Sequence, residues 1–156
     1  MNGKLTDWTV DELLPHRGDM SWLSRIVQVD DKSAIAEADI REGMFFLSEG
    51  RLGVWTGVEF MAQTVAAWAG GRAQREGRSV VIGMLVGSRQ YLAHCQHFSV
   101  GQTLRIESQL ELLADNGLGM FDCKISIHGT VVASSRLSVF EPPDAAAFLE
   151  LQKGRS

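Results

Sequence analysis

The stretch VWTGVEFMAQTVAAWA at residues 54–69 decides the fold of this 156-residue chain. Eleven of its sixteen residues are apolar, and they lie on every side of a helical wheel rather than along one stripe. A helix without a polar face must be covered on all sides by the rest of the protein. The sequence therefore predicts one long buried helix. Gly70 and Gly71 follow it and are expected to form its C-terminal cap, because glycine readily adopts the left-handed conformation.

The same region raises the alternative of a membrane span. Residues 52–71 contain a single charged residue, Glu59, and about 20 apolar residues suffice to cross a bilayer. However, Gln63 and two threonines also lie in this segment, and an ionisable group at bilayer depth is costly. The amphipathic strands elsewhere in the chain also need an apolar element to cover them. We therefore expect a buried helix and no membrane span.

Strand patterns flank the helix on both sides. Six runs have strand character: residues 22–29, 34–40, 80–92, 103–112, 120–128 and 131–140. In several of them apolar and polar residues alternate, which is typical of strands with one buried face. Asp115-Asn116-Gly117 and His128-Gly129 favour tight turns, which predicts that the last three strands are antiparallel neighbours. A short helix is expected after Thr9, because Thr9 and Glu12 form a capping box. Pro15 is expected to end this helix. A second short helix is expected at residues 145–151.

This order of elements predicts an α+β fold of the hot-dog type. A six-stranded antiparallel sheet wrapped around the long central helix would bury both the helix and one sheet face. No linker or repeat divides the chain, so residues 1–156 are expected to form a single domain with its core at about residues 13–141. Pairing of the exposed sheet edges across a two-fold axis would cover them, which favours a homodimer or a heterodimer.

Composition excludes several classes of function. Fifteen basic and nineteen acidic residues give a net charge of −4 without a basic cluster, which argues against nucleic-acid binding. The two cysteines stand behind an N-terminus that lacks a signal segment, so a cytoplasmic protein is expected. His94-Cys95-Gln96-His97 has no second ligand pair at zinc-like spacing, and no glycine-rich phosphate loop is present. We therefore expect neither a metal nor a cofactor.

Glu59 is the one acidic residue between Glu49 and Glu76, and it stands in an apolar helix. Burying an ionised carboxylate is unfavourable unless the group is neutralised or finds hydrogen-bond donors. Two interpretations stay open. Glu59 is either a structural group that faces a partner or is bonded to Gln63, or a general acid in a dry pocket.

Glu59 also lies within a recognisable motif. GVWTGVEFMAQ at residues 53–63 resembles the central-helix motif of hot-dog (3R)-hydroxyacyl-[acyl-carrier-protein] dehydratases, in which a catalytic acid is followed by Met-Ala-Gln. LPHR at residues 14–17 resembles the segment that opens these proteins, as in the dehydratase branch of aryl-polyene pathways. LVGSRQY at residues 85–91 and FSVGQTL at residues 98–104 are similar to the family's third strand and the turn that follows it.

The resemblance implies a role for several residues. In the family a histidine removes the proton α to a thioester carbonyl, an acid protonates the departing β-hydroxyl, and amides at the helix start polarise the carbonyl. Glu59 matches the acid. The family's loop histidine is missing from MFFLSEGRL at residues 44–52, which leaves His16 as the candidate base or, alternatively, as a structural histidine. The expected substrate-binding residues are Gly53, Val54, Trp55 and Gln63. Trp55, Phe60 and Trp68 are most simply core residues, with the alternative that some of them line an acyl tunnel.

Three functions are consistent with these residues. The first is a dehydratase of carrier-bound 3-hydroxyacyl thioesters in fatty-acid or polyene biosynthesis. The second is an acyl thioesterase of the same fold, in which Glu59 activates water, and the third is a non-catalytic subunit of a heteromeric dehydratase. The expected substrate is a thioester of acyl carrier protein or of coenzyme A. An acidic carrier would dock on basic side chains, for which the candidates are Arg17, Arg51 and Arg89.

Overall fold

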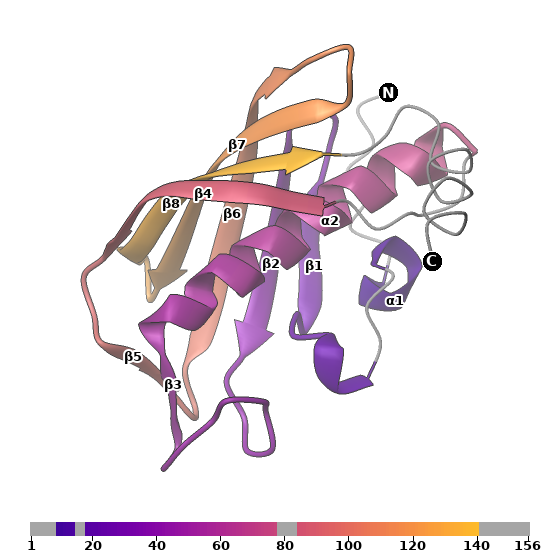
Figure 1. Ribbon diagram of the computed structural model, residues 1–156. Coiled ribbons are helices and arrows are strands. Elements are labelled where there is room, and N and C mark those ends of the chain that lie inside the picture. Colours follow the sequence, from indigo (N-terminus) through magenta and orange to yellow (C-terminus); the bar gives the residue numbers. More distant parts are fainter. Residues whose placement is uncertain (1–8, 15–17, 78–83, 141–156) are drawn as a thin grey trace, which may run out of the picture.

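The computed structural model describes residues 9–14, 18–77 and 84–140. In chain order its elements are α1 (Val10–Leu13), η1 (Gly18–Met20), β1 (Arg25–Val29), β2 (Ser33–Asp39), β3 (Arg51–Gly53), η2 (Val54–Thr56), α2 (Gly57–Arg75), β4 (Met84–Ala93), β5 (His97–Ser99), β6 (Thr103–Leu113), β7 (Leu118–Ile127) and β8 (Thr130–Phe140). Six strands form an antiparallel sheet in the order β1-β2-β6-β7-β8-β4, and β3 pairs with β5 in a small separate sheet. Helix α2 crosses the inner face of the large sheet (Figure 1). The predicted hot-dog fold is confirmed.

The core lies between α2 and the large sheet. From the helix, Trp68 packs edge-on against Phe121 of β7 with ring centroids 5.2 Å apart, and Phe60 contacts Phe98 of β5 at 6.2 Å. No residue of α2 from position 57 to position 73 is fully exposed, as expected for a helix without a polar face. None of the helices in the described part of the chain is long and apolar enough to cross a membrane.

The central helix is longer than predicted and ends at a different glycine. Residues 54–56 form a 3₁₀ turn, and α2 then continues to Arg75. The left-handed conformation at the end belongs to Gly77, with φ +68°, so the prediction that Gly70 and Gly71 cap the helix is wrong. Gly70 instead allows α1 to approach, because a Cβ atom at Gly70 would lie only 2.7 Å from the carbonyl carbon of Leu13 and 3.0 Å from its Cα.

Gly70→Ala is expected to lower the free energy of unfolding by about 2 kcal/mol, because the added methyl group meets backbone that must move away. This overpacking outweighs the roughly 1 kcal/mol that alanine normally gains over glycine inside a helix. Urea unfolding of the purified variant measures the difference. Gly87→Ala is the matched control, since a Cβ atom there would meet nothing within 4 Å. Equal stability of the two variants would contradict the close contact between α1 and α2.

Most of the other predicted boundaries hold to within a few residues. The capping box of Thr9 and Glu12 is present in α1, and His128 and Gly129 both have positive φ, as a tight β-hairpin requires. The first strand begins at Arg25 rather than at residue 22, because residues 22 and 23 are buried before the strand pairing starts. Sheet β3-β5 was not predicted, since three-residue strands carry little periodicity. The predicted helix at residues 145–151 lies outside the described residues.

Candidate active site

Glu59 lies in the first turn of α2 and is partly buried. Its Oε1 atom accepts a hydrogen bond from Nε2 of Gln63, one turn further along, at 2.9 Å. Gln63 is itself buried, and its Nε2 also donates to the carbonyl oxygen of Met20 at 2.8 Å. Its Oε1 accepts the backbone N–H of Trp22 at 2.9 Å. Gln63 thus connects Glu59 to the segment that precedes β1.

These bonds fix the orientation of the Glu59 carboxyl group. Both N–H groups of the Gln63 amide are used, and one of them donates to Oε1 of Glu59, so a proton on the carboxyl belongs on Oε2. No partner for Oε2 is present among the described residues. Glu59 is therefore bonded to Gln63, as expected if it is a structural group. The same bond leaves Oε2 available to donate a proton to a ligand or to accept one from it, as a general acid requires.

Strand β4 and the residues between β4 and β5 hold the start of the helix through hydrogen bonds to Val54. The Val54 N–H donates to the carbonyl oxygen of Gln96 at 3.2 Å. The Val54 carbonyl oxygen accepts two hydrogen bonds, one from the Gly57 N–H and one from the hydroxyl of Tyr91. Within the described residues, the Trp55 N–H has no partner. The resemblance implies that an amide at the start of the helix polarises the carbonyl. The Val54 amide at this start is occupied by Gln96, whereas the Trp55 amide has no partner among the described residues.

Aromatic side chains surround this helix start. Trp55 is 59% exposed, so its expected place in the core is wrong, whereas Phe60 and Trp68 are buried as expected. The indole of Trp55 covers Gly53, at which a Cβ atom would overlap it. Phe46 packs edge-on against Trp55 with ring centroids 5.1 Å apart. The loop that lacks the family's histidine therefore places an exposed phenylalanine beside the expected substrate-binding residues.

The other candidates are placed only in part. His16 and Arg17 lie outside the described residues, so the role of His16 stays a prediction. Arg51 on β3 and Arg89 on β4 are both exposed, as a docking role requires. Across the described ranges, no group of three or more His, Cys, Asp or Glu residues is placed to hold a metal ion.

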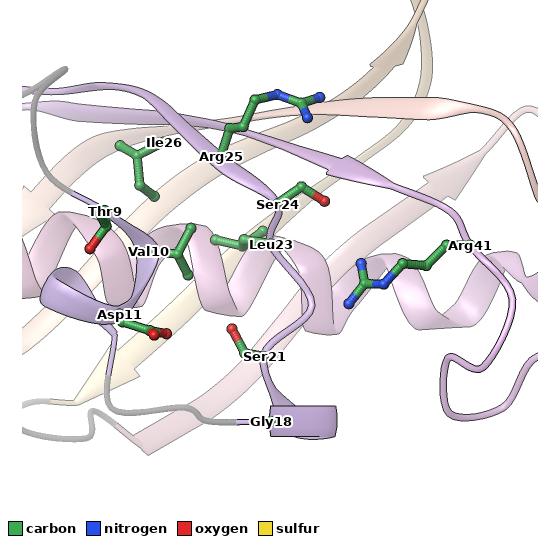
Figure 2. Close-up of a pocket in the computed structure, with 10 residues that line it drawn as sticks. All are labelled: Thr9, Val10, Asp11, Gly18, Ser21, Leu23, Ser24, Arg25, Ile26 and Arg41. Atoms are coloured by element: carbon green, nitrogen blue, oxygen red, sulfur yellow. The ribbon is translucent and has the colours of Figure 1, made fainter.

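A cavity of about 580 Å³ lies between α1 and the segment that leads into β1 (Figure 2). Ser21 and Leu23 line it, and the side chain of Arg41 extends toward it from the other side (Figure 2). Neither Glu59 nor Gln63 is among its lining residues. The cavity is therefore separate from the Glu59 carboxyl group.

Tyr91 is a functional candidate that sequence reasoning missed, although it lies in a quoted motif. Burial raises the pKa of its phenol from 10.0 to about 12, and the negative charge on the nearby Cys95 sulfur adds to the shift. Because the folded pKa lies above the unfolded one, this group's contribution to stability is present below pH 10 and is lost as the pH rises toward 12. Tyr91 is the chain's single tyrosine, so tyrosinate absorbance of the native protein should show a midpoint near pH 12. A native midpoint near the unfolded value would contradict the burial.

An antiparallel sheet around a buried helix, with an acid in the first turn of that helix, defines a hot-dog protein with a candidate proton-transfer group. The chain matches the ApeP-like family, described as ApeP dehydratase, over residues 8–150. It therefore belongs to the ApeP-like dehydratase family, which confirms the resemblance seen in its motifs.

Solved structures agree with this membership. The dehydratase heterocomplex ApeI:P from Xenorhabdus doucetiae contains a chain with 29% identity and a TM-score of 0.82, with 92% of this chain and 97% of that chain covered. Cj0977, a sigma28-regulated virulence protein from Campylobacter jejuni, matches at 12% identity and a TM-score of 0.66, with 86% and 88% covered. A hypothetical thioesterase with coenzyme A from Streptococcus pneumoniae matches at 11% and 0.59, with 74% and 83% covered. The last two show the fold alone, and no curated protein matches the chain.

Proposed function

We propose that this protein dehydrates 3-hydroxyacyl thioesters bound to an acyl carrier protein in a polyene-type pathway, together with a second hot-dog subunit. Membership in the ApeP-like dehydratase family supports the reaction. The similar chain from Xenorhabdus doucetiae, which belongs to a dehydratase heterocomplex, supports the second subunit.

The proposed reaction needs a base, an acid and a carbonyl-polarising donor. The base removes the proton α to the thioester carbonyl, and the electron pair of the C–H bond forms the new carbon–carbon double bond. The C–O bond to the β-hydroxyl breaks as Oε2 of Glu59 gives that oxygen a proton, so water leaves. Exchange with solvent then returns the proton from the base to Glu59. An amide at the start of the helix stabilises the charge that develops on the carbonyl oxygen.

The observation that carries this proposal is the hydrogen bond from Gln63 to Oε1 of Glu59. It holds the carboxyl in one orientation, with Oε2 available to a ligand, as an acid that donates a single proton requires. His16 is proposed as the base. Met20 lies four residues after His16, and its carbonyl oxygen accepts a hydrogen bond from the same Gln63 amide. Four residues of chain span at most about 14 Å. This short separation along the chain supports His16 as the proposed base.

A non-catalytic role in a heteromeric dehydratase is the second candidate function. The observation that favours it is the loop before α2, in which the family's histidine is absent and two phenylalanines, Phe45 and Phe46, are exposed. In that case the partner subunit would supply both the acid and the base, and this chain would only complete the substrate tunnel of its partner. The two candidates differ in whether turnover depends on Glu59 of this chain.

Mass spectrometry of the carrier-bound product separates the functions. The protein is incubated with a 3-hydroxyacyl carrier protein, alone and with a hot-dog subunit of the type found in the ApeI:P complex. Loss of water that requires Glu59 supports the proposed dehydratase. Loss of water that persists when Glu59 is replaced in the complex indicates the non-catalytic subunit, and release of the free acid indicates a thioesterase.

A further inference from the structure

Tyr91 stands on β4, which forms one edge of the large sheet and pairs with β8 (Figure 1). Between Arg89 and Leu92 the register shifts, because β4 has one residue more than β8 at this point. Gln90 within this bulge has φ +56°, which is uncommon for a residue other than glycine. Bulges bend a strand and redirect its side chains. Because of the extra residue, the side chain of Tyr91 does not follow the alternation set by the residues of β4 before the bulge.

The redirected side chain reaches the start of the central helix. The Tyr91 hydroxyl donates to the carbonyl oxygen of Val54, although the two residues are far apart in the sequence. Gly57 makes this approach possible, because a Cβ atom at position 57 would overlap the Tyr91 hydroxyl. The glycine and the tyrosine therefore form a matched pair, in which the absent side chain leaves room for the hydroxyl.

Together, Tyr91 and Gln96 hold Val54 from two sides. Gln96 accepts the Val54 N–H, and Tyr91 donates to the Val54 carbonyl oxygen. That carbonyl belongs to the same planar trans peptide group as the Trp55 N–H, so the two point in opposite directions. A bond that fixes the carbonyl also fixes the direction of the free Trp55 N–H. Trp55 stands four residues before Glu59, about one helical turn away.

We infer that Tyr91 is a positioning residue of the dehydration reaction: its hydroxyl fixes the Val54–Trp55 peptide group so that the Trp55 N–H points at the thioester carbonyl oxygen. This inference rests on the proposed function. It assigns the polarising amide to Trp55, because the Val54 amide is occupied by Gln96. The edge strand β4 thereby contributes to the reaction without contacting the substrate.

Tyr91→Phe tests the inference in the complex with the second subunit. The change removes one of the two donors to the Val54 carbonyl oxygen. The Gly57 N–H still binds this oxygen and keeps the start of the helix folded, but a peptide group held by one bond instead of two can tilt. A misdirected amide should lower kcat by about tenfold to a hundredfold, below the roughly 10²–10³-fold cost of losing such a donor altogether. KM should stay within about twofold, because the effect arises in the transition state.

Ser135→Ala is the matched control for this variant. Ser135 also donates its hydroxyl to a backbone carbonyl at the same bulge, that of Arg89 at 3.0 Å, but this bond does not reach the helix. The control is expected to keep kcat within about twofold of the wild type. Wild-type kcat in Tyr91→Phe would overturn the inference, as would a loss of kcat that matches only the loss of folded protein.

A spectroscopic measurement tests the same inference independently of turnover. Because the chain has one tyrosine, growth with 3-fluorotyrosine labels Tyr91 alone, and the labelled chain is combined with unlabelled partner. A non-reactive thioester analogue of the carrier-bound substrate should shift the single ¹⁹F resonance. An unchanged resonance at saturating analogue would overturn the inference. If the wild type produces no dehydration, the proposed function fails, but the ¹⁹F shift still reports whether a thioester reaches the helix start.

Discussion

Glu59→Gln is expected to abolish dehydration while leaving the protein folded. Without the acid, the β-hydroxyl must leave as hydroxide, and loss of a positioned proton-transfer group costs about 10²–10⁴-fold in rate. The amide oxygen of the new side chain can still accept the hydrogen bond that Gln63 now donates to Oε1. The link between α2 and the segment before β1 therefore stays in place, and the thermal unfolding midpoint should change by no more than a few degrees.

The rate is measured as water loss from the carrier-bound 3-hydroxyacyl thioester in the assembled complex. Glu42→Gln is the matched control, because it makes the same chemical change at an exposed loop position and should leave the rate unchanged. Full water loss with folded Glu59→Gln protein would exclude the acid role of Glu59 in the dehydratase. Unfolding of the variant would instead identify Glu59 as a structural group.

His16→Ala is expected to slow dehydration by a similar factor, about 10²–10⁴-fold, if His16 removes the α-proton. Histidine suits this role because its ordinary pKa lies near neutral pH. Loss of the base should lower kcat more than it raises KM, since the imidazole acts on the bound substrate. Added imidazole should restore part of the rate, because a small base can enter the space that the side chain leaves.

His94→Ala provides the comparison for this variant. His94 is an exposed histidine after β4, and its replacement should leave both the rate and its pH dependence unchanged. A His16→Ala variant that equals the wild type would show that this chain does not supply the base through His16. Together with an unchanged Glu59→Gln rate, that result would favour the non-catalytic subunit.

The elements of the fold could be predicted because their signals are local. The all-round apolar pattern at residues 54–69 requires a covered helix, and the alternation in β6 and β7 identifies which strand face is buried. Leu104 and Ile106 on β6, and Phe121 and Ile125 on β7, are buried as that alternation predicts. Their positions depend only on the period of the backbone and on the hydrophobic effect.

The candidate acid could also be found in the sequence, because a lone carboxyl group in an apolar helix is unusual whatever surrounds it. The same holds for its neighbour Gln63, which lies one turn further along the same helix. The orientation of the Glu59 carboxyl could not be found there. It depends on the bonds of Gln63 to Met20 and Trp22, which are more than forty positions earlier in the chain.

Only the tertiary structure decided which groups meet at the helix start. The sequence predicts Gly70 as a helix cap, whereas the structure shows that it makes room for the backbone of Leu13. The sequence favours Trp55 as a core residue, whereas the structure places its side chain on the surface. Tyr91 gains a role only because a bulge in β4 brings its hydroxyl to Val54. Periodicity along a chain specifies which face of an element is buried, but contacts between distant segments depend on how these faces pack, and a single sequence does not encode that as a local pattern.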